Sequence, residues 1–545
     1  MKVLIGNAWP YSSGSLHLGR LAAWIPGDIL ARYHREKGDE VIFISGSDCH
    51  GTPILMKAKE EKKSPREVSD YYHNEFKRYF EKADMSFDIY AKTDSPYHHK
   101  IVRELVTELY KNGYIYEKIL EQNYCEECGE YLSDKMIEGT CPYCGGAARG
   151  DQCEECSALL DPEDLIDKKC KVCHSEPVIK QTKHLFFKLS SFDNDIKALV
   201  ERDGRYWRND SIKITKRYIK EGLRDRAITR TLDWGVDVPF PGFEDKKIYV
   251  WIDAIMGYIS ASRKVAEERN EDYKEYWNDE NSRIYFVHGK DNIPFHTVIL
   301  PAILYGLNIG KSEIRMVSSQ YINLEGKKFS AAKNWAVWVP YIFDHYDSDS
   351  IRYYLTIHGA EKRDSDFTWR KFINSHNGDL LGCYGNFINR SLSFIHKNFD
   401  GKLDNCGLNE EIQRKLKNLY IIAGNKIENG EFKAALEKIF DFIKESNKYF
   451  DNEKPWVTLK EDKERCRNTL YNCVQIIANL SNLLEPFVPE SAAKIRQFLN
   501  IEKPIWSFVE LKDVSVNELS FLFTRIDKSK IDEEIQLMID ARNAE

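Results

Sequence analysis

Short apolar runs near the start of the chain predict buried strands. Residues 2–6 and 41–45 are continuous apolar runs of strand length. Between them, apolar residues recur three and four positions apart over residues 18–30, which predicts a helix that Pro26 bends or interrupts. A second helical pattern, over residues 102–113, ends on glycine. This alternation of strands and helices predicts an α/β fold with a parallel sheet and helical crossovers.

The pattern changes twice along the rest of the chain. From about residue 122 to 177, periodicity gives way to cysteine, charge and glycine, which indicates an insertion. Apolar runs then return and are expected to continue the sheet as strands, at residues 248–253, 284–288 and 314–318.

Beyond about residue 373 the pattern is almost entirely helical. Apolar positions lie three and four apart without strand-like alternation over residues 411–429, 431–450 and 462–484. This predicts an α-helical bundle, followed by a charged tail from Asp527 that packs as one last helix.

Composition places the chain among large globular proteins. Its 545 residues predict three or four domains, and 42% hydrophobic with 30% charged residues suits a sizeable core. The net charge of −7 supplies no global basic field, so any RNA binding must use local patches. The N-terminus lacks the apolar segment of a secretory signal, and no apolar run approaches membrane-spanning length. We therefore expect a cytoplasmic protein without membrane partners.

Four Cys-x-x-Cys pairs concentrate eight of the thirteen cysteines in one short region. Each pair can offer two thiolates to one tetrahedral metal ion, so the region predicts two structural Zn²⁺ sites rather than disulfides. Spacing alone leaves open whether neighbouring pairs share a metal or whether the pairs are nested. The pairs are Cys125 and Cys128, Cys141 and Cys144, Cys153 and Cys156, and Cys170 and Cys173.

A short polar motif lies where the first loop enters a helix. His17-Leu-Gly-Arg20 is placed to use free backbone N–H groups and the helix dipole, which favour phosphate. Gly19 allows close approach of a ligand, His17 can donate a hydrogen bond, and Arg20 adds permanent charge. Taken alone, such a motif is more often structural than functional.

In context, four sequence blocks resemble one enzyme family. Ala8-Trp-Pro-Tyr-Ser-Ser-Gly-Ser-Leu-His-Leu-Gly-Arg20 resembles the first signature of class I aminoacyl-tRNA synthetases in its methionyl form. Gly46-Ser-Asp-Cys-His-Gly-Thr-Pro53, Tyr249-Val-Trp-Ile-Asp-Ala-Ile-Met-Gly-Tyr258 and His288-Gly-Lys-Asp-Asn-Ile-Pro-Phe-His296 are similar to further methionyl-tRNA synthetase blocks in the same order. The resemblance covers nearly the whole chain. It implies an enzyme that activates methionine with ATP, with Mg²⁺ accompanying ATP, and transfers it to tRNA(Met).

Two positions depart from the family pattern. Arg20 stands where the first signature usually ends in histidine. The second signature, usually Lys-Met-Ser-Lys-Ser, is here Lys328-Phe-Ser-Ala-Ala332, so Ala331 replaces the lysine that helps to hold the ATP phosphates. Lys327 and Lys333 lie nearby but not at that position. The change bears on catalytic rate more than on fold.

The resemblance also assigns ligand positions. Asp48 and the Trp9 backbone would hold the methionine ammonium group, and a mostly aromatic cleft suits the thioether. That cleft would be lined by Tyr11, Trp251, Ala254, Ile255, Tyr258, Ile293, Phe295 and His296, and Trp234 resembles a mobile tryptophan of the family. ATP would be bound by His17, Gly19, Arg20, Gly289, Lys290, Asp291 and Lys328, and catalysis would be assisted by His17, Arg20, Lys328 and Ser330.

For zinc, the resemblance implies nested pairing. Cys141, Cys144, Cys153 and Cys156 would bind an inner ion, and Cys125, Cys128, Cys170 and Cys173 an outer one.

For tRNA, the resemblance implies three anticodon-reading residues. Asn386 and Arg390 are four apart on a predicted helix and face one side, while Trp456 can stack on an unpaired base. Residues 213–230, with seven basic and two acidic side chains, are a candidate phosphate-contacting stretch.

Taken together, we expect a Rossmann-like α/β catalytic domain with an inserted zinc-knuckle domain, followed by an α-helical anticodon-binding bundle, in a monomer. The altered second signature motivates one alternative, a paralogue that binds tRNA with weak or altered activation. A second alternative is a non-catalytic zinc-knuckle RNA-binding protein. The expected domains are the catalytic halves 1–116 and 233–325, the insertion 117–232, the second-signature and stem-contact region 326–375, the bundle 376–520 and the tail 521–545.

Overall fold

The computed structural model describes residues 1–543 except 133–135, 151–152, 154, 157–159 and 161–163. In this part of the chain, the largest sheet has five parallel strands in the order β14-β13-β1-β2-β3. β1 is central, and Ile5 pairs with Phe43 on one side and Tyr285 on the other. The predicted parallel sheet is confirmed, with strands β1 (Lys2–Asn7), β2 (Glu40–Ser47), β3 (Ile89–Lys92), β13 (Arg283–Gly289) and β14 (Glu313–Ser319).

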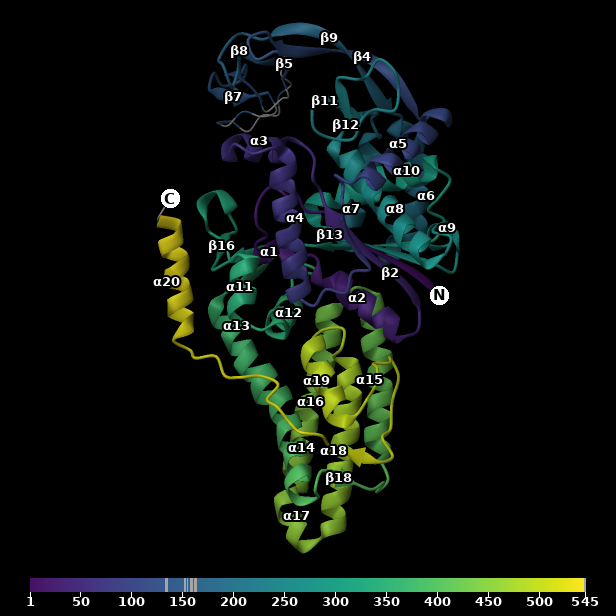
Figure 1. The fold of residues 1–545 in the computed structure, drawn as a ribbon, viewed down its shortest axis with the longest axis vertical. Coiled ribbons are helices and arrows are strands. Elements are labelled where there is room, and N and C mark those ends of the chain that lie inside the picture. The colour runs from purple at the N-terminus through teal and green to yellow at the C-terminus, as the bar shows by residue number, and fades with distance from the viewer. Residues whose placement is uncertain (133–135, 151–152, 154, 157–159, 161–163, 544–545) are drawn as a thin grey trace.

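Helices cover both faces of this sheet (Figure 1). Successive side chains of a strand point to opposite faces. Val3 and Ile5 accordingly join the core formed with α2 and α4, whereas Leu4 joins the core formed with α5, α8 and α10. The covering helices are α2 (Ile25–Glu36), α4 (Pro65–Lys82), α5 (Pro96–Lys111), α8 (Val250–Arg269) and α10 (Leu300–Gly306).

Pro26 divides the first helical segment as predicted. The segment consists of α1 (Leu18–Leu21) and α2, with Pro26 in the first turn of α2. Proline is tolerated there because the amides of the first turn have no helical partner. The break leaves His17 at the N-cap of a short separate helix.

The strand predicted at residues 248–253 is wrong. β12 (Lys246–Ile248) ends where that run begins, and α8 starts at Val250. A short continuous apolar run does not distinguish a buried strand from a buried helix. Here α8 is packed against β2, β3 and α5, so most of its positions are apolar and its helical periodicity is weak.

The insertion leaves the catalytic sheet on a long two-stranded ribbon. β4 (Ile115–Cys125) and β9 (Val178–Phe187) pair antiparallel from Ile115 opposite Phe187 to Tyr124 opposite Val178. The ribbon carries the cysteine-rich module at its far end (Figure 1). The module contains β5 (Glu130–Tyr131), β6 (Ile137–Thr140), β7 (Ala147–Arg149) and β8 (Ile166–Cys170).

Smaller elements connect the sheet to the module and to the bundle. The connection around the second signature is a sheet in the order β16-β15-β17. The smaller elements are α3 (Thr52–Glu61), α6 (Asp193–Asp203), α7 (Asn209–Glu221), β10 (Arg226–Ala227), β11 (Thr229–Thr231), α9 (Lys274–Asn278), β15 (Ile322–Leu324), β16 (Lys327–Lys328), α11 (Val339–His345), α12 (Ser348–Ile357), β17 (Ser365–Phe367) and α13 (Trp369–Ser375).

The C-terminal region is the predicted helical bundle, with the short pair β18 (Lys402–Leu403) and β19 (Val514–Ser515). The bundle and the cysteine module lie at opposite ends of the molecule, and the tail helix returns beside α11 and α13 (Figure 1). Its helices are α14 (Asn386–Asn398), α15 (Glu410–Glu428), α16 (Phe432–Glu453), α17 (Pro455–Glu461), α18 (Lys463–Leu483) and α19 (Pro489–Leu499), with α20 (Lys530–Asn543) in the tail.

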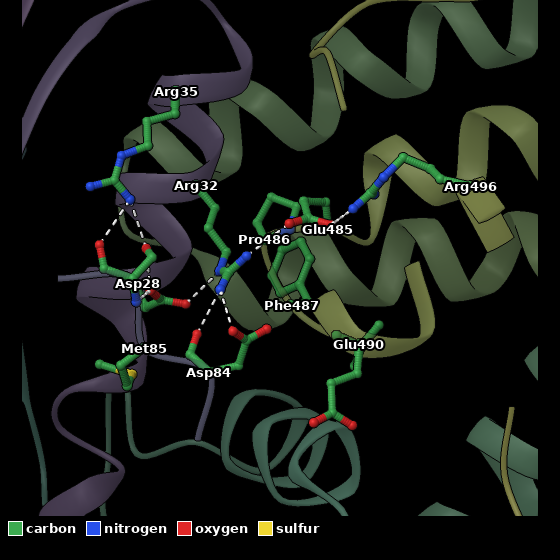
Figure 2. Close-up of polar contacts among 12 residues, drawn as sticks. Asp28, Arg32, Arg35, Asp84, Met85, Glu485, Pro486, Phe487, Glu490 and Arg496 are labelled. Atoms are coloured by element: carbon green, nitrogen blue, oxygen red, sulfur yellow. Dashed lines mark hydrogen bonds and ion pairs between the residues drawn. The ribbon is translucent and has the colours of Figure 1, made fainter. Parts of the chain in front are cut away.

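A buried ionic network joins the bundle to α2 (Figure 2). Arg32 Nε donates to Asp28 Oδ2 at 2.9 Å, and its Nη1 donates to Glu485 at 2.8 Å. Glu485 also pairs with Arg496 at 2.7 Å, while Arg352 contacts Asp28 at 2.6 Å. Burial alone would raise the pKa of Asp28, but the charges of Arg32 and Arg352 hold it far below its usual range. The network fixes α2 against the bundle.

No helix in the described part of the chain is long and apolar enough to cross a membrane.

Candidate functional site

The order of the strands defines where a ligand would bind. From β1 the chain adds β2 and β3 on one side, and later β13 and β14 on the other. In an open parallel sheet, ligands bind beyond the carboxyl ends of the strands, where the strand order reverses. Here that point lies between β1 and β13. The sequence motifs lie at these strand ends, from Ala8 after β1 and from Gly289 at the end of β13.

Asp48 lies at this edge, directly after β2, and is only 3% exposed. Its backbone is fixed because its amide donates to Pro10 O at 2.8 Å and its carbonyl accepts from Ser12 N at 2.9 Å. Its carboxylate accepts one backbone hydrogen bond, from His50 N, at 3.2 Å. Burial, with the nearby Asp253 carboxylate, raises the pKa of Asp48 well above its usual value. A cation placed beside Asp48 would therefore be bound strongly.

Asp253 on α8 is fully buried but paired on both oxygens. His50 Nδ1 lies 2.6 Å from Oδ2, and His98 Nε2 lies 2.5 Å from Oδ1. The other nitrogen of His98 contacts Ser260 Oγ at 2.8 Å. Burial alone would raise the pKa of Asp253, but the two histidines hold it far below its usual value. Asp253 thus favours its ionised form, and its charge acts on the nearby Asp48.

An aromatic wall stands next to Asp48. Trp251 is 40% exposed, and its indole Nε1 donates to the Tyr11 hydroxyl. The ring of Phe295 meets Trp251 edge to face, with centroids 4.2 Å apart. Such ring edges and faces suit a thioether. Trp251, Ala254, Ile255 and Tyr258 follow the spacing of one helical face of α8, whereas sequence reasoning placed the aromatic residues on a strand.

His296 forms the inner end of this wall. Its Nδ1 lies 2.8 Å from the Asn292 carbonyl and its Nε2 lies 2.9 Å from the Tyr258 hydroxyl. A carbonyl only accepts, so Nδ1 carries the proton and Nε2 accepts from Tyr258. Burial lowers the pKa of His296 to about 4, so the ring is neutral. Ile293, in the same segment, is fully buried.

Glycines make room for the rings. A Cβ on Gly257 would come within 2.8 Å of the Trp9 ring, and a Cβ on Gly46 within 2.5 Å of it. A Cβ on Gly6 would approach Tyr258 to 2.7 Å. The Trp9 side chain is thus packed between β2 and α8, which leaves its backbone at the edge of the sheet. Trp234 packs on His50 and donates from Nε1 to Cys49 O at 2.7 Å.

On the nucleotide side, His17 caps α1 and stacks on Phe329 of the second signature. The centroids are 4.8 Å apart and the planes differ by 14°. Burial and the neighbouring Arg20 lower the pKa of His17 to about 3, so its ring is neutral. Gly19 lies under both rings, since a Cβ there would come within 3.1 Å of Phe329. Arg20 is exposed.

The turn after β13 presents Gly289, Lys290 and Asp291. Lys290 Nζ donates to Gln320 at 3.2 Å and lies 4.6 Å from the centre of the Tyr321 ring. Asp291 accepts a hydrogen bond from the Tyr321 hydroxyl. These contacts tie the ends of β13 and β14 together at the edge of the sheet.

The second signature forms a hairpin and a closed loop. Glu325 and Gly326 both have positive φ, at 48° and 75°, as a tight two-residue turn between β15 and β16 requires. Lys328 follows on exposed β16, and Ser330 exchanges both backbone hydrogen bonds with Trp335. Ala331 begins the short helical turn between them. The structure therefore places Lys328 and Ser330 on the same loop as Phe329, which touches His17.

The eight cysteines form two separate groups. The sulfur atoms of Cys125, Cys128, Cys170 and Cys173 lie within 4.8 Å of one another, as do those of Cys141, Cys144, Cys153 and Cys156. The shortest contacts are 3.3 Å and 3.5 Å, and none of these thiols is in a disulfide. In the structure the cysteines thus group as nested pairs, which is the arrangement that the resemblance implies for the metal sites.

Hydrogen bonds lower the pKa of two of these thiols. A hydrogen bond from Ser175 lowers the pKa of Cys173 to about 6, and the backbone amide of Cys156 lowers that of Cys153 to about 7. A lowered thiol pKa favours the thiolate form, which is the form that binds a metal ion.

The expected RNA-reading residues lie at the far end of the bundle. The Arg390 guanidinium lies 4.6 Å from the centre of the Phe450 ring and 5.9 Å from that of Trp456. Trp456 is 45% exposed, and Arg390 also pairs with Asp451 at 2.7 Å. Asn386 starts α14 one turn before Arg390 and is half-buried.

The basic stretch at residues 213–230 is largely exposed on and after α7. Its exposed basic side chains are Lys213, Lys216, Arg217, Lys220, Arg224 and Arg226.

Two family profiles together match nearly the whole chain. The profile described as "tRNA synthetases class I (M)" matches residues 3–392, and "Anticodon binding domain of methionyl tRNA ligase" matches residues 403–524. The chain belongs to the class I methionyl-tRNA synthetase family. Members of this family are aminoacyl-tRNA ligases.

Relatives that match over nearly their whole length belong to the same family. Methionine--tRNA ligase 1 of Alkaliphilus oremlandii (strain OhILAs) is 49% identical over 536 residues, which cover 98% of this chain and 99% of the relative. Methionine--tRNA ligase of Bacillus cereus (strain B4264) is 49% identical over 537 residues, covering 98% of each. Such coverage does not fit a zinc-knuckle RNA-binding protein that lacks a catalytic domain.

Solved structures show the same fold. A crystal structure of Mycobacterium tuberculosis methionyl-tRNA synthetase bound by methionyl-adenylate superposes with a TM-score of 0.79 at 23% identity. A second structure of that enzyme in complex with methionyl-adenylate gives 0.80 at 24%. Each match covers 96% of this chain and 100% of the other.

Within this methionyl-tRNA synthetase fold, sequence reasoning missed the partners beneath Asp48. His50 and Asp253 both lie inside the quoted motifs, and His98 begins α5. A signal was present, because an acid within an apolar helical run must find partners when buried. The identity of those partners depends on the packing of α5 against α8, which no single segment encodes.

Proposed function

We propose that this chain activates methionine with ATP to give methionyl-adenylate and then transfers the methionyl group to tRNA(Met). The observation that carries the proposal is the buried carboxylate of Asp48 beside the wall of Trp251, Tyr11 and Phe295, at the point where the strand order of the sheet reverses. A buried acid next to a ring-lined cleft matches a substrate with an ammonium group and a thioether side chain.

Asp48 holds the ammonium group of methionine in this proposal, together with the backbone of Trp9. Without substrate, burial and Asp253 disfavour the ionised form of Asp48. A bound ammonium group reverses that balance, because an opposite charge within a few ångströms favours the carboxylate. The binding energy is therefore concentrated on the α-amino group.

The side chain of methionine occupies the aromatic wall. Trp251, Tyr11 and Phe295 contact the thioether, and the neutral Tyr258–His296 pair closes the inner end. Because Nε2 of His296 already accepts from Tyr258 and Nδ1 donates to a backbone carbonyl, the pair offers little to a charged side chain. The remaining pocket residues are Ala254, Ile255 and Ile293.

ATP lies across the neighbouring turn. The methionine carboxylate attacks the α-phosphorus in line, and pyrophosphate leaves, so positioning and charge neutralisation carry the chemistry. Neutral His17 donates a hydrogen bond to phosphate, while Arg20 and Lys328 supply positive charge. Mg²⁺ enters with the triphosphate as part of the substrate. The other contacts come from Gly19, Gly289, Lys290, Asp291 and Ser330.

The cysteine groups fit two structural Zn²⁺ ions. A tetrahedral ion with Zn–S bonds of about 2.3 Å separates its sulfur atoms by about 3.8 Å. The sulfur–sulfur contacts are 3.3 Å and 3.8 Å in the group of Cys125 and 3.5 Å and 3.8 Å in the group of Cys141, at or somewhat below that value. Four thiolates leave no coordination position for a substrate. Zinc here would supply folding energy to a module with a small apolar core.

For tRNA, we propose that Trp456 stacks on an anticodon base while Asn386 and Arg390 read base edges. The exposed ring of Trp456 offers a stacking platform, and Arg390 exchanges its ion pair with Asp451 for RNA. The basic side chains of residues 213–230 contact phosphates near the catalytic domain. The domain limits given above, a monomeric state and a cytoplasmic location belong to this proposal.

Methionine-dependent ATP–pyrophosphate exchange tests the proposal. We expect exchange with methionine and not with the other standard amino acids, and loss of exchange in Asp48→Asn. Asp364→Asn is a matched control, because Asp364 is exposed and accepts a hydrogen bond from the Tyr321 backbone. Absence of exchange with every amino acid, in protein loaded with zinc, would contradict the proposed activity.

A further inference from the structure

A second group of polar atoms converges beside the methionine pocket. His50, Asp94 and His99 each offer one nitrogen or oxygen atom, and all of these atoms lie within 4.8 Å of one another. His50 follows β2, Asp94 follows β3, and His99 lies in the first turn of α5. Parallel strands and a following helix thus bring three potential metal ligands together at the same edge of the sheet.

Two of these ligand atoms have no hydrogen-bond partner among the described residues. His50 is 1% exposed, and its Nε2 is buried and unpaired. Nε2 of His99 is also buried without a hydrogen bond, and it lies 3.8 Å from Asp94 Oδ1. A buried polar atom without a hydrogen-bond partner is energetically unfavourable. Two such nitrogens beside one carboxylate therefore indicate a missing ligand.

His50 is already oriented for metal binding. Its Nδ1 lies 2.6 Å from the Asp253 carboxylate, so Nδ1 carries the proton and Nε2 turns its lone pair toward the cluster. The same carboxylate is held on its other oxygen by His98. A carboxylate that fixes the ring of a ligating histidine is the usual outer-shell arrangement of metal sites.

Asp94 is shared with Arg66. The guanidinium lies 3.0 Å and 3.1 Å from the two carboxylate oxygens, and it stacks over Trp234. Each carboxylate oxygen has two lone pairs, so Asp94 can keep Arg66 and still accept a cation. The Arg66 side chain is 64% exposed, which allows it to move away and screens its charge. Its charge nevertheless makes this site weaker than the cysteine groups.

We propose that His50, Asp94 and His99 form a third metal site, which binds Zn²⁺ or a similar divalent cation. Two imidazole nitrogens and one carboxylate oxygen suit such an ion. Three protein ligands leave a fourth tetrahedral position, which a water molecule would occupy. Unlike the cysteine groups, the site contains no thiolate.

The site adjoins the acid that holds methionine in the proposed function. The backbone amide of His50 donates to Asp48 Oδ1 at 3.2 Å, and the side chain of His50 contacts Asp253. A divalent cation on His50 adds positive charge next to the position of the substrate ammonium group. Occupancy therefore weakens methionine binding, which makes the site a means of regulation by free Zn²⁺. This consequence, unlike the site itself, rests on the proposed function.

Zinc counting by equilibrium dialysis tests the site without an activity measurement. Protein loaded at the cysteine groups is dialysed against buffered Zn²⁺ of rising concentration, and zinc per chain is measured. We expect a third equivalent in the unmodified chain, and His99→Ala and Asp94→Asn should each lower its affinity by about tenfold or more. His345→Ala, which removes an exposed histidine of α11, is the control and should keep all three. A limit of two ions in the unmodified chain, or a third ion retained by both variants, would overturn the proposal.

Two further readouts separate the possible failures. Co²⁺ added to the zinc-loaded protein should give visible d–d absorption without the ultraviolet thiolate band, and a thiolate band in place of it would show that the ion had entered a cysteine group. In the exchange assay, Zn²⁺ at the third-site concentration should raise KM for methionine severalfold in the unmodified chain and not in His99→Ala. An equal KM in both would overturn the coupling to methionine. If no exchange occurs at all, the proposed function fails while dialysis still decides the site.

Discussion

Phe329 stacks on His17, with ring centroids 4.8 Å apart and planes 14° from parallel. This contact joins the first signature, at the start of α1, to the loop of the second signature after β16. The backbone reinforces it, because Leu18 N donates to Val337 O at 2.8 Å and Val339 N donates to Leu16 O at 2.8 Å. The second-signature loop is therefore held against the proposed ATP site from both sides.

Loss of the stacked ring is expected to weaken ATP binding. Aromatic pairs contribute about 0.5–1.5 kcal/mol beyond area burial, so Phe329→Ala should raise KM for ATP by about two- to tenfold. KM for methionine should change little, because Phe329 is on the nucleotide side. Phe329→Met, which restores the residue usual in the family, is the control and should retain most of the affinity. Equal ATP affinity in Phe329→Ala and the unmodified chain would show that the stack does not position the loop.

Ala331 removes a positive charge from the same loop. Ala331→Lys is expected to raise the rate of methionine activation by about tenfold, since an added cation stabilises charge that develops on the leaving pyrophosphate. Ala331→Met adds similar length without charge and should leave the rate unchanged. Single-turnover formation of methionyl-adenylate measures the step directly. No acceleration in the lysine variant would indicate that Lys327 or Lys333 already serves this role.

Asp48→Asn is expected to stabilise the free protein while it abolishes methionine binding. The folded pKa of Asp48 is raised by burial, so from an unfolded pKa of about 3.9 upward the unfolded chain loses this proton first. The native state binds more protons than the unfolded state in this window, and the Asp48 contribution to stability falls as pH rises. Asparagine does not titrate, so the Tm advantage of the variant should be small near pH 4 and larger at pH 7. A Tm difference independent of pH would contradict the raised pKa.

Asp48→Asn also distinguishes an effect on methionine binding from an effect on protein stability. A buried charge pair that loses one partner costs about 2–5 kcal/mol, so kcat/KM for methionine should fall by roughly 30- to 5,000-fold. Scanning calorimetry and the exchange assay on one preparation give both results. A stabilised variant with full exchange would place the ammonium group elsewhere.

Trp456→Ala should impair tRNA charging without affecting activation. Stacking of a base on an aromatic ring contributes about 1–3 kcal/mol, which corresponds to a fall in kcat/KM for tRNA of roughly 5- to 150-fold. Trp456 belongs to α17, which lies at the end of the bundle away from the sheet (Figure 1), so ATP–pyrophosphate exchange should be unchanged. Phe521→Ala, which removes an exposed ring elsewhere on the surface, is the control. Equal charging by Trp456→Ala would exclude this platform.

Sequence patterns predicted the elements whose periodicity is local. The spacing of apolar residues alone predicts the strands β1 and β2, the break at Pro26 and the long helices α15, α16 and α18. The start of α8 did not, because Trp251 and its neighbours form a run that suits a buried strand equally well. Packing against β2 and α5 decides in favour of the helix.

In the proposed active site, too, local sequence patterns predicted some residues, whereas tertiary packing determines others. Asp48 could be placed because an acid that follows an apolar strand lies at the ligand edge of a parallel sheet. The pairing of Asp253 with His50 and His98, and the stack of Phe329 on His17, join segments far apart in sequence. Their geometry arises from helix packing and loop closure, and no motif spacing specifies it.

The grouping of the cysteines gives a prediction that distinguishes nested from sequential metal sites. Cys128 and Cys170 lie in one group and Cys144 lies in the other. The double variant Cys128→Ser with Cys170→Ser should therefore lose one zinc per chain, whereas Cys128→Ser with Cys144→Ser should lose both. Sequential pairing would reverse these two results, because Cys128 and Cys144 would then share an ion. Zinc should be counted by elemental analysis after dialysis against a weak chelator, which also strips the weaker third site.

Both double variants lose the outer ion, and this loss has an expected structural effect on the ribbon. Loss of the outer ion, between Cys125, Cys128, Cys170 and Cys173, releases the end of the β4–β9 ribbon, since Cys125 ends β4 and Cys170 ends β8. Hydrogen exchange should then increase near Tyr124 and Val178, which pair at the tip of the ribbon, and not at Ile115 and Phe187 beside the sheet. Exchange that increased equally along the ribbon would mean that the metal stabilises the whole insertion, and not only the module at its end.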